Sequence, residues 1–298
     1  MCAMVTQAFG SITLIPPEPA LLSPIDPFKN PKAFSEMVCI LYHAERAALE
    51  AFGRLTDESI VQNCEVFLEA RPMLLADEEA HLRDMEQIIR LVGGGAIGPA
   101  PAGFAELWDL ERTRQRLPFP LPAEVAALFT LIAESVGYAY LYHMAKATSN
   151  PEVAKLLWAN VEDEQRHLQV SMQVLATALA KRTALVELGM HFYAFMVLSR
   201  NAARTMMASL SAIGLQPYLL ASSSLQFTTE LIGLVLAKRF GAVFNLQMFR
   251  RAMRIAFSPH MIRLYHAATY VPEPPFIWPV FRRCVGLIRK NKSTKRGD

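Results

Sequence analysis

Apolar residues recur at helical spacing in four long stretches of the chain, and no stretch shows strand-like alternation of comparable strength. These stretches cover about 31–52, 57–92, 122–149 and 151–181. Two of them open on the pair Asn-Pro, at Asn30-Pro31 and Asn150-Pro151, which is typical of a helix cap followed by proline at the first helical position. The pattern predicts an all-α protein.

Proline and glycine predict how these helices connect. We expect Pro72 to kink or divide the second stretch, because proline cannot donate the interior helical hydrogen bond. Residues 93–122 are rich in Gly and Pro and predict one long link between the second and third helices, as in a bundle with a crossover connection. We therefore expect an extended N-terminal arm, a four-helix bundle, additional C-terminal helices packing on it, and a basic tail, at 1–30, 31–182, 183–281 and 282–298.

Composition changes this picture little. The chain has 298 residues, 52% of them hydrophobic, so it can bury a sizeable core. The stretch Thr205–Thr229 carries no formal charge, but its serines, glutamines and proline make it too polar for a membrane span, and we expect a buried helix pair. The net charge of +3 says little about partners, and no surface for nucleic acid is favoured.

The cysteines and the N-terminus bear on the compartment. Four cysteines are scattered without a CxxC pair, which argues against a zinc knuckle, a rubredoxin-type iron site and a thioredoxin-like redox motif. The N-terminus lacks a basic segment before its apolar residues, so a secretory signal is not expected. Both observations fit a reducing, cytoplasmic setting.

Two copies of the pattern D-E-x-x-H carry the candidate chemistry. They are Asp77-Glu78-Glu79-Ala80-His81 and Asp163-Glu164-Gln165-Arg166-His167. A glutamate and a histidine three residues apart lie on one face of a helix, so both can reach one metal ion. Carboxylate and imidazole ligands suit iron or manganese, and the absence of thiolate argues against structural zinc.

The helices before the two motifs also match each other. Glu45 precedes Glu78 by 33 residues, and Glu134 precedes Glu164 by 30. The difference is about one helical turn, which a proline or a hairpin loop can absorb. The chain therefore reads as two helical hairpins that together supply two glutamates and two Glu-x-x-His pairs, the arrangement of a di-iron bundle.

This ligand pattern resembles the ferritin-like di-iron carboxylate superfamily over roughly residues 33–180, and the D-E-Q-R-H form is similar to motifs of bacterial multicomponent monooxygenases and soluble acyl-carrier-protein desaturases. The resemblance implies two iron ions, with mixed manganese–iron occupancy left open. It implies bridging ligands and terminal ligands as follows: Glu78 and Glu164 bridge, Glu45 and His81 complete one ion, and Glu134 and His167 complete the other. Asp77 and Asp163 would each hydrogen-bond the histidine of the opposite motif.

The sequence leaves the roles of residues next to the predicted ligands open. Tyr42 shares the face of Glu45, and Tyr138, four residues after Glu134, should project into the site as a catalytic candidate; core packing is the alternative for both. Many monooxygenases of the superfamily place threonine where Tyr138 stands. Met85 occupies the position of the radical tyrosine of ribonucleotide reductase small subunits, and Asn160 that of an extra histidine in aryl-amine N-oxygenases. Both departures disfavour those activities.

The expected function is an oxygenase that activates O2 to hydroxylate, N-oxygenate or desaturate a partly apolar organic substrate, free or bound to a carrier. Such an enzyme needs an external electron donor, a reductase or ferredoxin. Two alternatives remain: an iron-handling ferroxidase or peroxidase, and a membrane-peripheral quinone-type hydroxylase that uses the basic tail 282–298. A homodimer is left open.

Overall fold

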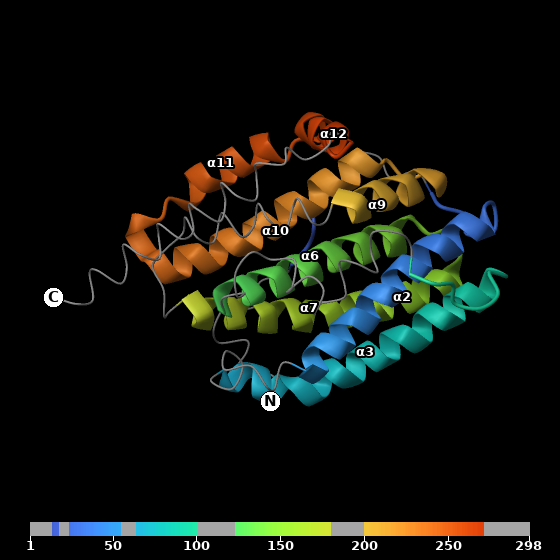
Figure 1. Ribbon diagram of the computed structural model, residues 1–298, viewed down its shortest axis with the longest axis horizontal. Coiled ribbons are helices and arrows are strands. Elements are labelled where there is room, and N and C mark those ends of the chain that lie inside the picture. Colours follow the sequence, from blue (N-terminus) through green and yellow to red (C-terminus); the bar gives the residue numbers. More distant parts are fainter. Residues whose placement is uncertain (1–13, 18–23, 55–63, 101–122, 180–199, 271–298) are drawn as a thin grey trace.

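Four long helices form the body of the computed structural model, which describes residues 14–17, 24–54, 64–100, 123–179 and 200–270. They are α2 (Pro31–Arg54), α3 (Glu65–Leu91), α6 (Ala123–Ala147) and α7 (Pro151–Leu179). They lie side by side in Figure 1, with α2 against α3, α6 against α7, and α3 against α7. Every regular element in the described residues is a helix, so the prediction of an all-α protein is confirmed.

The Asn-Pro pairs begin helices as predicted. The side-chain oxygen of Asn30 accepts a hydrogen bond from the backbone N–H of Ala33 at 3.3 Å, and α2 starts at Pro31. The side-chain oxygen of Asn150 accepts from Glu152 and Val153 at 3.1 and 3.0 Å. Each asparagine thus satisfies N–H groups that a helix leaves without intrahelical partners.

Pro72 does not divide the second helix. Helix α3 continues through it from Glu65 to Leu91, while residues 57–63, which the pattern placed in the same helix, lie outside the described residues. Pro72 is the eighth residue of α3 and is exposed, so the disruption of the helix falls on its solvent side.

The described part of the N-terminal arm packs along α6. Ile25 is buried, its N–H donates to Ala147 O at 2.7 Å, and its carbonyl accepts from Ser149 N at 2.8 Å. Leu14 is also buried, and its carbonyl accepts a hydrogen bond from the hydroxyl of Tyr138 at 2.5 Å. The boundaries at 182/183 and 281/282, and the whole tail 282–298, lie outside the described residues.

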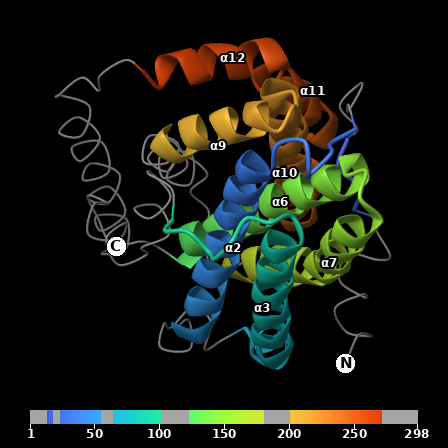
Figure 2. The same ribbon diagram turned by 90° about the vertical axis from the view of Figure 1, so that its right-hand side faces the viewer.

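A second layer follows the four long helices. It contains α9 (Arg200–Ala212), α10 (Pro217–Phe240), the short 3-10 turn η2 (Gly241–Val243), α11 (Leu246–Ala256) and α12 (Pro259–Ala268). Helix α10 packs on α6 and α7, and α9 also contacts α2. Figures 1 and 2 show α11 and α12 on the outer side of α10, away from α3 and α7.

Helix α10 contains most of the uncharged, serine-rich stretch. The segment Pro217–Val243 is long and apolar enough to cross a membrane by length and composition, but 67% of its apolar window is buried inside the protein. Two of its buried hydroxyls have side-chain partners on α6: Thr228 Oγ1 lies 2.8 Å from Ser135 Oγ, and Ser223 Oγ lies 3.0 Å from His143 Nε2. Paired hydroxyls of this kind fit a helix that packs on other helices inside a protein, and they would be unfavourable on a helix surface that faces lipid.

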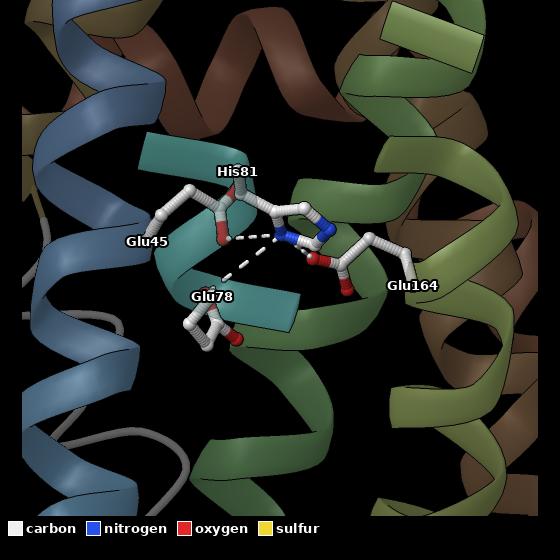
Figure 3. A group of neighbouring side chains, drawn as sticks. All are labelled: Glu45, Glu78, His81 and Glu164. Carbon is white, nitrogen blue, oxygen red and sulfur yellow. Dashed lines mark ion pairs between the residues drawn. The ribbon is translucent and has the colours of Figure 1, made fainter. Parts of the chain in front are cut away.

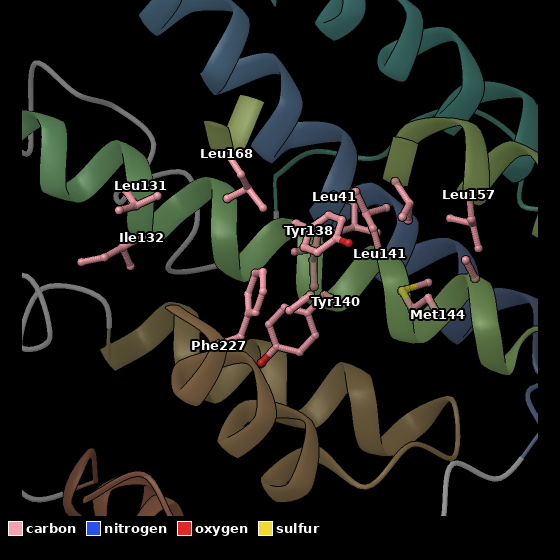
Figure 4. Packing of buried hydrophobic residues seen from close by; sticks show 14 of the residues in the cluster. Leu41, Leu131, Ile132, Tyr138, Tyr140, Leu141, Met144, Leu157, Leu168 and Phe227 are labelled. Carbon is pink, nitrogen blue, oxygen red and sulfur yellow. The ribbon is translucent and has the colours of Figure 1, made fainter. Parts of the chain in front are cut away.

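Buried side chains of α6, α7 and α10 belong to one hydrophobic core. Figure 4 shows Tyr138, Leu141, Leu157 and Phe227 among its buried side chains. The rings of Tyr138 and Phe227 lie 5.5 Å apart, so aromatic packing joins α6 of the first layer to α10 of the second.

The core makes a direct stability prediction. Leu157 is fully buried, and Leu157→Ala should lower the free energy of unfolding by about 2–5 kcal/mol, because the change removes apolar contacts and leaves a cavity. Leu68→Ala on α3, where the side chain is 41% exposed, should cost less than about 1 kcal/mol. Urea unfolding of both variants measures the difference, and equal losses would contradict this description of the core.

Candidate metal centre

Six carboxylate and imidazole side chains converge between the four long helices. Each is between 0 and 8% exposed. Helix α2 contributes Glu45, α3 contributes Glu78 and His81, α6 contributes Glu134, and α7 contributes Glu164 and His167. The two Glu-x-x-His pairs reach the same point because residues three apart share a face of a helix. The structure thus brings together all six of the predicted metal ligands.

His81 faces a cluster of carboxylates with one ring nitrogen. Its Nδ1 lies 3.5 Å from Glu45 Oε2, 3.9 Å from Glu78 Oε2 and 3.5 Å from Glu164 Oε1. Figure 3 shows these four side chains, which come from α2, α3 and α7. They form one group that could hold a metal ion.

His167 faces a second cluster in the same way. Its Nδ1 lies 3.4 Å from Glu78 Oε1, 3.6 Å from Glu134 Oε2 and 3.6 Å from Glu164 Oε2. The two imidazole rings are 5.7 Å apart between centroids. This second group could also hold a metal ion.

The two groups share Glu78 and Glu164. Each of these carboxylates directs one oxygen to Nδ1 of His81 and its other oxygen to Nδ1 of His167. Glu45 belongs to the first group alone and Glu134 to the second. Two neighbouring cation sites with two shared carboxylates therefore fit these side chains.

The outward nitrogens of both histidines meet aspartates from the opposite motif. His81 Nε2 lies 3.4 Å from Asp163 Oδ2, and His167 Nε2 lies 3.3 Å from Asp77 Oδ2. This is the pairing that the superfamily resemblance implies. An aspartate at Nε2 holds the proton there and leaves Nδ1 as the electron-pair donor toward the centre.

Arg166 ties the two aspartates together, a role that sequence reasoning missed. Its Nη2 lies 3.1 Å from Asp77 Oδ2 and 2.5 Å from Asp163 Oδ1. The equivalent position of the first motif is Ala80, so a single arginine serves both motifs. The presence of arginine in only one of the two D-E-x-x-H motifs was the signal in the sequence.

Burial and like charge shape the electrostatics of the centre. Burial, together with the neighbouring carboxylates, raises the pKa of Glu78 and of Glu164 well above the usual value. Burial opposes the charged form of His81, but Asp163 and Glu45 outweigh it and raise its pKa to about 11. Burial likewise opposes the charged form of His167, yet Glu164 and Asp77 raise its pKa. The buried carboxylates thus need positive charge close by.

Unpartnered buried atoms test whether metal ions fit here. Both carboxylate oxygens of Glu78, Oε2 of Glu164, and Nδ1 of both His81 and His167 are buried without a hydrogen-bond partner. Buried polar atoms in proteins normally have a partner. Carboxylate oxygens and imidazole nitrogens that converge without hydrogen-bond partners have the chemistry of a site for two divalent cations. The four carboxylates would offset the charge of those cations.

The remaining predicted residues contact other side chains and backbone atoms. The hydroxyl of Tyr138 donates to Leu14 O and accepts from Gln165 Nε2 at 3.1 Å, and burial raises its pKa. Tyr42 is half-buried, with its ring edge-on to His43 at 5.4 Å. Catalytic or supporting roles for the two tyrosines stay predictions. Asn160 is buried and donates to Asp84 Oδ2 at 2.9 Å.

Comparisons of the chain with protein-family models, with curated proteins and with solved structures found no match.

Two substitutions test the ligands. Glu164→Ala and His167→Ala should each abolish binding of a second divalent ion, because each removes a donor from the second group. Metal analysis after loading with ferrous iron measures the stoichiometry. Glu162→Ala, two residues before Glu164 and exposed, is the matched control and should load as the unaltered protein does. Full loading of both ligand variants would contradict the assignment.

A third substitution tests the electrostatic cost of the centre. In the presence of a chelator, Glu78→Gln should raise the thermal midpoint by roughly 2–4 °C, equivalent to about 1 kcal/mol, because it removes one of four crowded buried carboxylates. The same variant should bind metal poorly. Glu79→Gln, the exposed neighbour, should change neither property. A lower midpoint for Glu78→Gln would show that the metal-free protein relies on that carboxylate.

Proposed function

We propose that this chain is a ferritin-like protein that holds two iron ions and activates O2 to oxidise an organic, partly apolar substrate. One observation carries the proposal: Glu78 and Glu164 each direct one oxygen toward each of two histidines. Carboxylates placed this way can bridge two cations. Each cation would then also have one histidine and one glutamate of its own as available ligands.

The donor set suits iron or manganese. It contains only carboxylate oxygen and imidazole nitrogen, which suit iron and manganese, and mixed manganese–iron occupancy would use the same donors. Glu45, Glu78, His81, Glu134, Glu164 and His167 would hold the pair. When bound, such a pair supplies the reduction of O2 with electrons from an external donor, a reductase or ferredoxin.

The protein's own side chains prepare the site for that chemistry. Asp77 and Asp163 hold the proton of each histidine on Nε2, and Arg166 holds the two aspartates in place. Fixed outer partners of this kind keep the imidazole rings oriented and raise their basicity as ligands. The centre is buried inside four helices, so bulk water is kept from the donors.

The surroundings support an apolar substrate. The ring of Phe52 meets the ring of His167 edge-on at 6.3 Å, and Phe67 lies 6.0 Å from Phe52. Both phenylalanines are buried. An apolar or partly apolar molecule, free or on a carrier, would find a compatible environment on this side of the centre, whereas a highly charged one would not.

A cytoplasmic setting belongs to the same proposal. The cysteines among the described residues, Cys39 and Cys64, are buried free thiols. A reducing compartment preserves such thiols and also supplies the electron donors that the proposed activity requires.

Oxygen consumption and iron stoichiometry test the function together. Protein loaded anaerobically with ferrous iron should saturate at two ions per chain, as Glu45, Glu78, Glu134 and Glu164 provide ligands for two, and should consume O2 on mixing. Mössbauer spectroscopy of the same sample should show a coupled pair. His167→Ala is the control and should lose both the coupled pair and rapid O2 consumption.

Excess ferrous iron separates oxygenation from iron handling. An oxygenase keeps two ions per chain through repeated cycles of reduction and oxidation, whereas a ferroxidase of the storage kind continues to take up iron beyond that number. Uptake well above two ions per chain would move the function to iron handling. Loading with no coupled pair would overturn the proposed centre.

A further inference from the structure

The segment 243–270, which includes α11 and α12, presents exposed apolar side chains. Most of the large apolar side chains that are exposed in the described residues belong to residues 243–270: Val243 92%, Met248 68%, Ile255 72%, Leu264 51%, Tyr265 41% and Tyr270 63%. Scattered exposed apolar residues are ordinary, but a concentration on one surface usually marks a contact site. We call these six residues, with the arginines described below, the outer strip.

The orientation of α11 is set by its inner face. Gly233 of α10 lies so close to Leu246 and Phe249 that an added Cβ would approach within 2.9 and 3.0 Å of them. Arg250 pairs with Glu230 of α10, with its Nε 2.7 Å from Glu230 Oε2. These contacts hold α11 against α10, so its other face must point away from the protein.

That other face alternates apolar and cationic residues. Met248, Ala252 and Ile255 follow at helical spacing and are exposed, and Arg251 and Arg254 are exposed beside them. Arg263 of α12 is also exposed, with its guanidinium 5.2 Å from the ring centre of Tyr218. Figures 1 and 2 show both helices on the same outer side of α10.

The charged side chains of residues 231–272 are all basic. The sequence contains no aspartate or glutamate from 231 to 272, but it contains Lys238, Arg239, Arg250, Arg251, Arg254 and Arg263 there. The nearest preceding carboxylate, Glu230, is paired with Arg250. The outer strip therefore combines apolar side chains with positive charge that its own segment does not balance.

We propose that α11 and α12 dock on the surface of an anionic lipid bilayer. Apolar side chains such as Met248 and Ile255 would enter the headgroup region, and Arg251, Arg254 and Arg263 would meet lipid phosphates. Charge decides between occupants: a second copy joined through the same strip would bring arginine against arginine. An anionic bilayer complements both the charge and the exposed apolar surface.

The docking is peripheral. Helix α10 has the length of a span, but it is packed between α6 and α7 on one side and α11 and α12 on the other. The inference differs from a role for the basic tail 282–298, because it places the contact on two folded helices. It is also independent of the metal centre, so either could fail while the other holds.

Vesicle flotation of the full chain tests the docking. Binding should be strong to vesicles that contain phosphatidylglycerol, weak to pure phosphatidylcholine, and reduced when salt is raised from about 0.05 M to about 0.5 M. Arg251→Gln/Arg254→Gln should weaken partitioning to the anionic vesicles by about thirty-fold, since each cation near the surface contributes about fivefold. Met248→Ser/Ile255→Ser should weaken it by about tenfold.

Matched controls remove the same groups from another surface. Arg46 and Arg90, on α2 and α3, are 58% and 66% exposed, and Arg46→Gln/Arg90→Gln should leave partitioning unchanged. Leu68→Ser on α3 is the apolar control. Circular dichroism checks that every variant is folded. Unchanged binding of both α11 variants would overturn the proposal.

Three other outcomes would also overturn it. If removal of residues 282–298 alone abolished binding, the basic tail would be the docking element. If bound protein resisted extraction by alkaline carbonate, α10 would be a span. If the free protein sedimented as a dimer that Met248→Ser/Ile255→Ser dissociated, and vesicles bound neither form, the strip would be an interface between copies of the chain.

Discussion

The burial of four carboxylates at one point is the constraint on which the rest of the structure depends. Glu45, Glu78, Glu134 and Glu164 come from four different helices, and none is more than 8% exposed. Such an arrangement is unfavourable unless positive charge lies among the carboxylates. Protonated His81 and His167 can supply it in the metal-free protein, and the proposed pair of iron ions would supply it when bound. A protein that keeps this cluster accepts a cost in stability for a site ready to bind metal.

The aspartates and the arginine around that centre also explain why the two helical hairpins depend on each other. Each D-E-x-x-H motif directs its histidine inward and its aspartate across to the other motif, so neither half is complete alone. Arg166 closes the arrangement by contacting both aspartates. The contact between α3 and α7 is therefore held by charged and hydrogen-bonded groups as well as by apolar packing, which fixes the two helices in one register.

The second layer relates the centre to the surface. Helix α10 meets α6 through paired hydroxyls and through the ring of Phe227 on Tyr138, whose hydroxyl reaches Leu14 of the N-terminal arm and Gln165 beside Glu164. On its other side α10 supports α11 through Gly233 and Glu230. One buried helix thus connects the side chains next to the candidate metal centre to the strip proposed to dock on lipid.

The sequence by itself determined what depends on neighbours along one helix. Periodicity predicted an all-α protein, Asn30-Pro31 and Asn150-Pro151 marked two helix starts, and the spacing of three put each glutamate and histidine on one face. Tertiary structure alone decided which oxygen of Glu78 and Glu164 faces which histidine, and that Arg166 joins both aspartates. It also decided that the Tyr138 hydroxyl turns to Leu14 and that α11 exposes Arg251 and Arg254 while Arg250 pairs with Glu230. These features depend on how separate helices rotate and stack, which side chains distant in the chain settle together and local spacing does not encode.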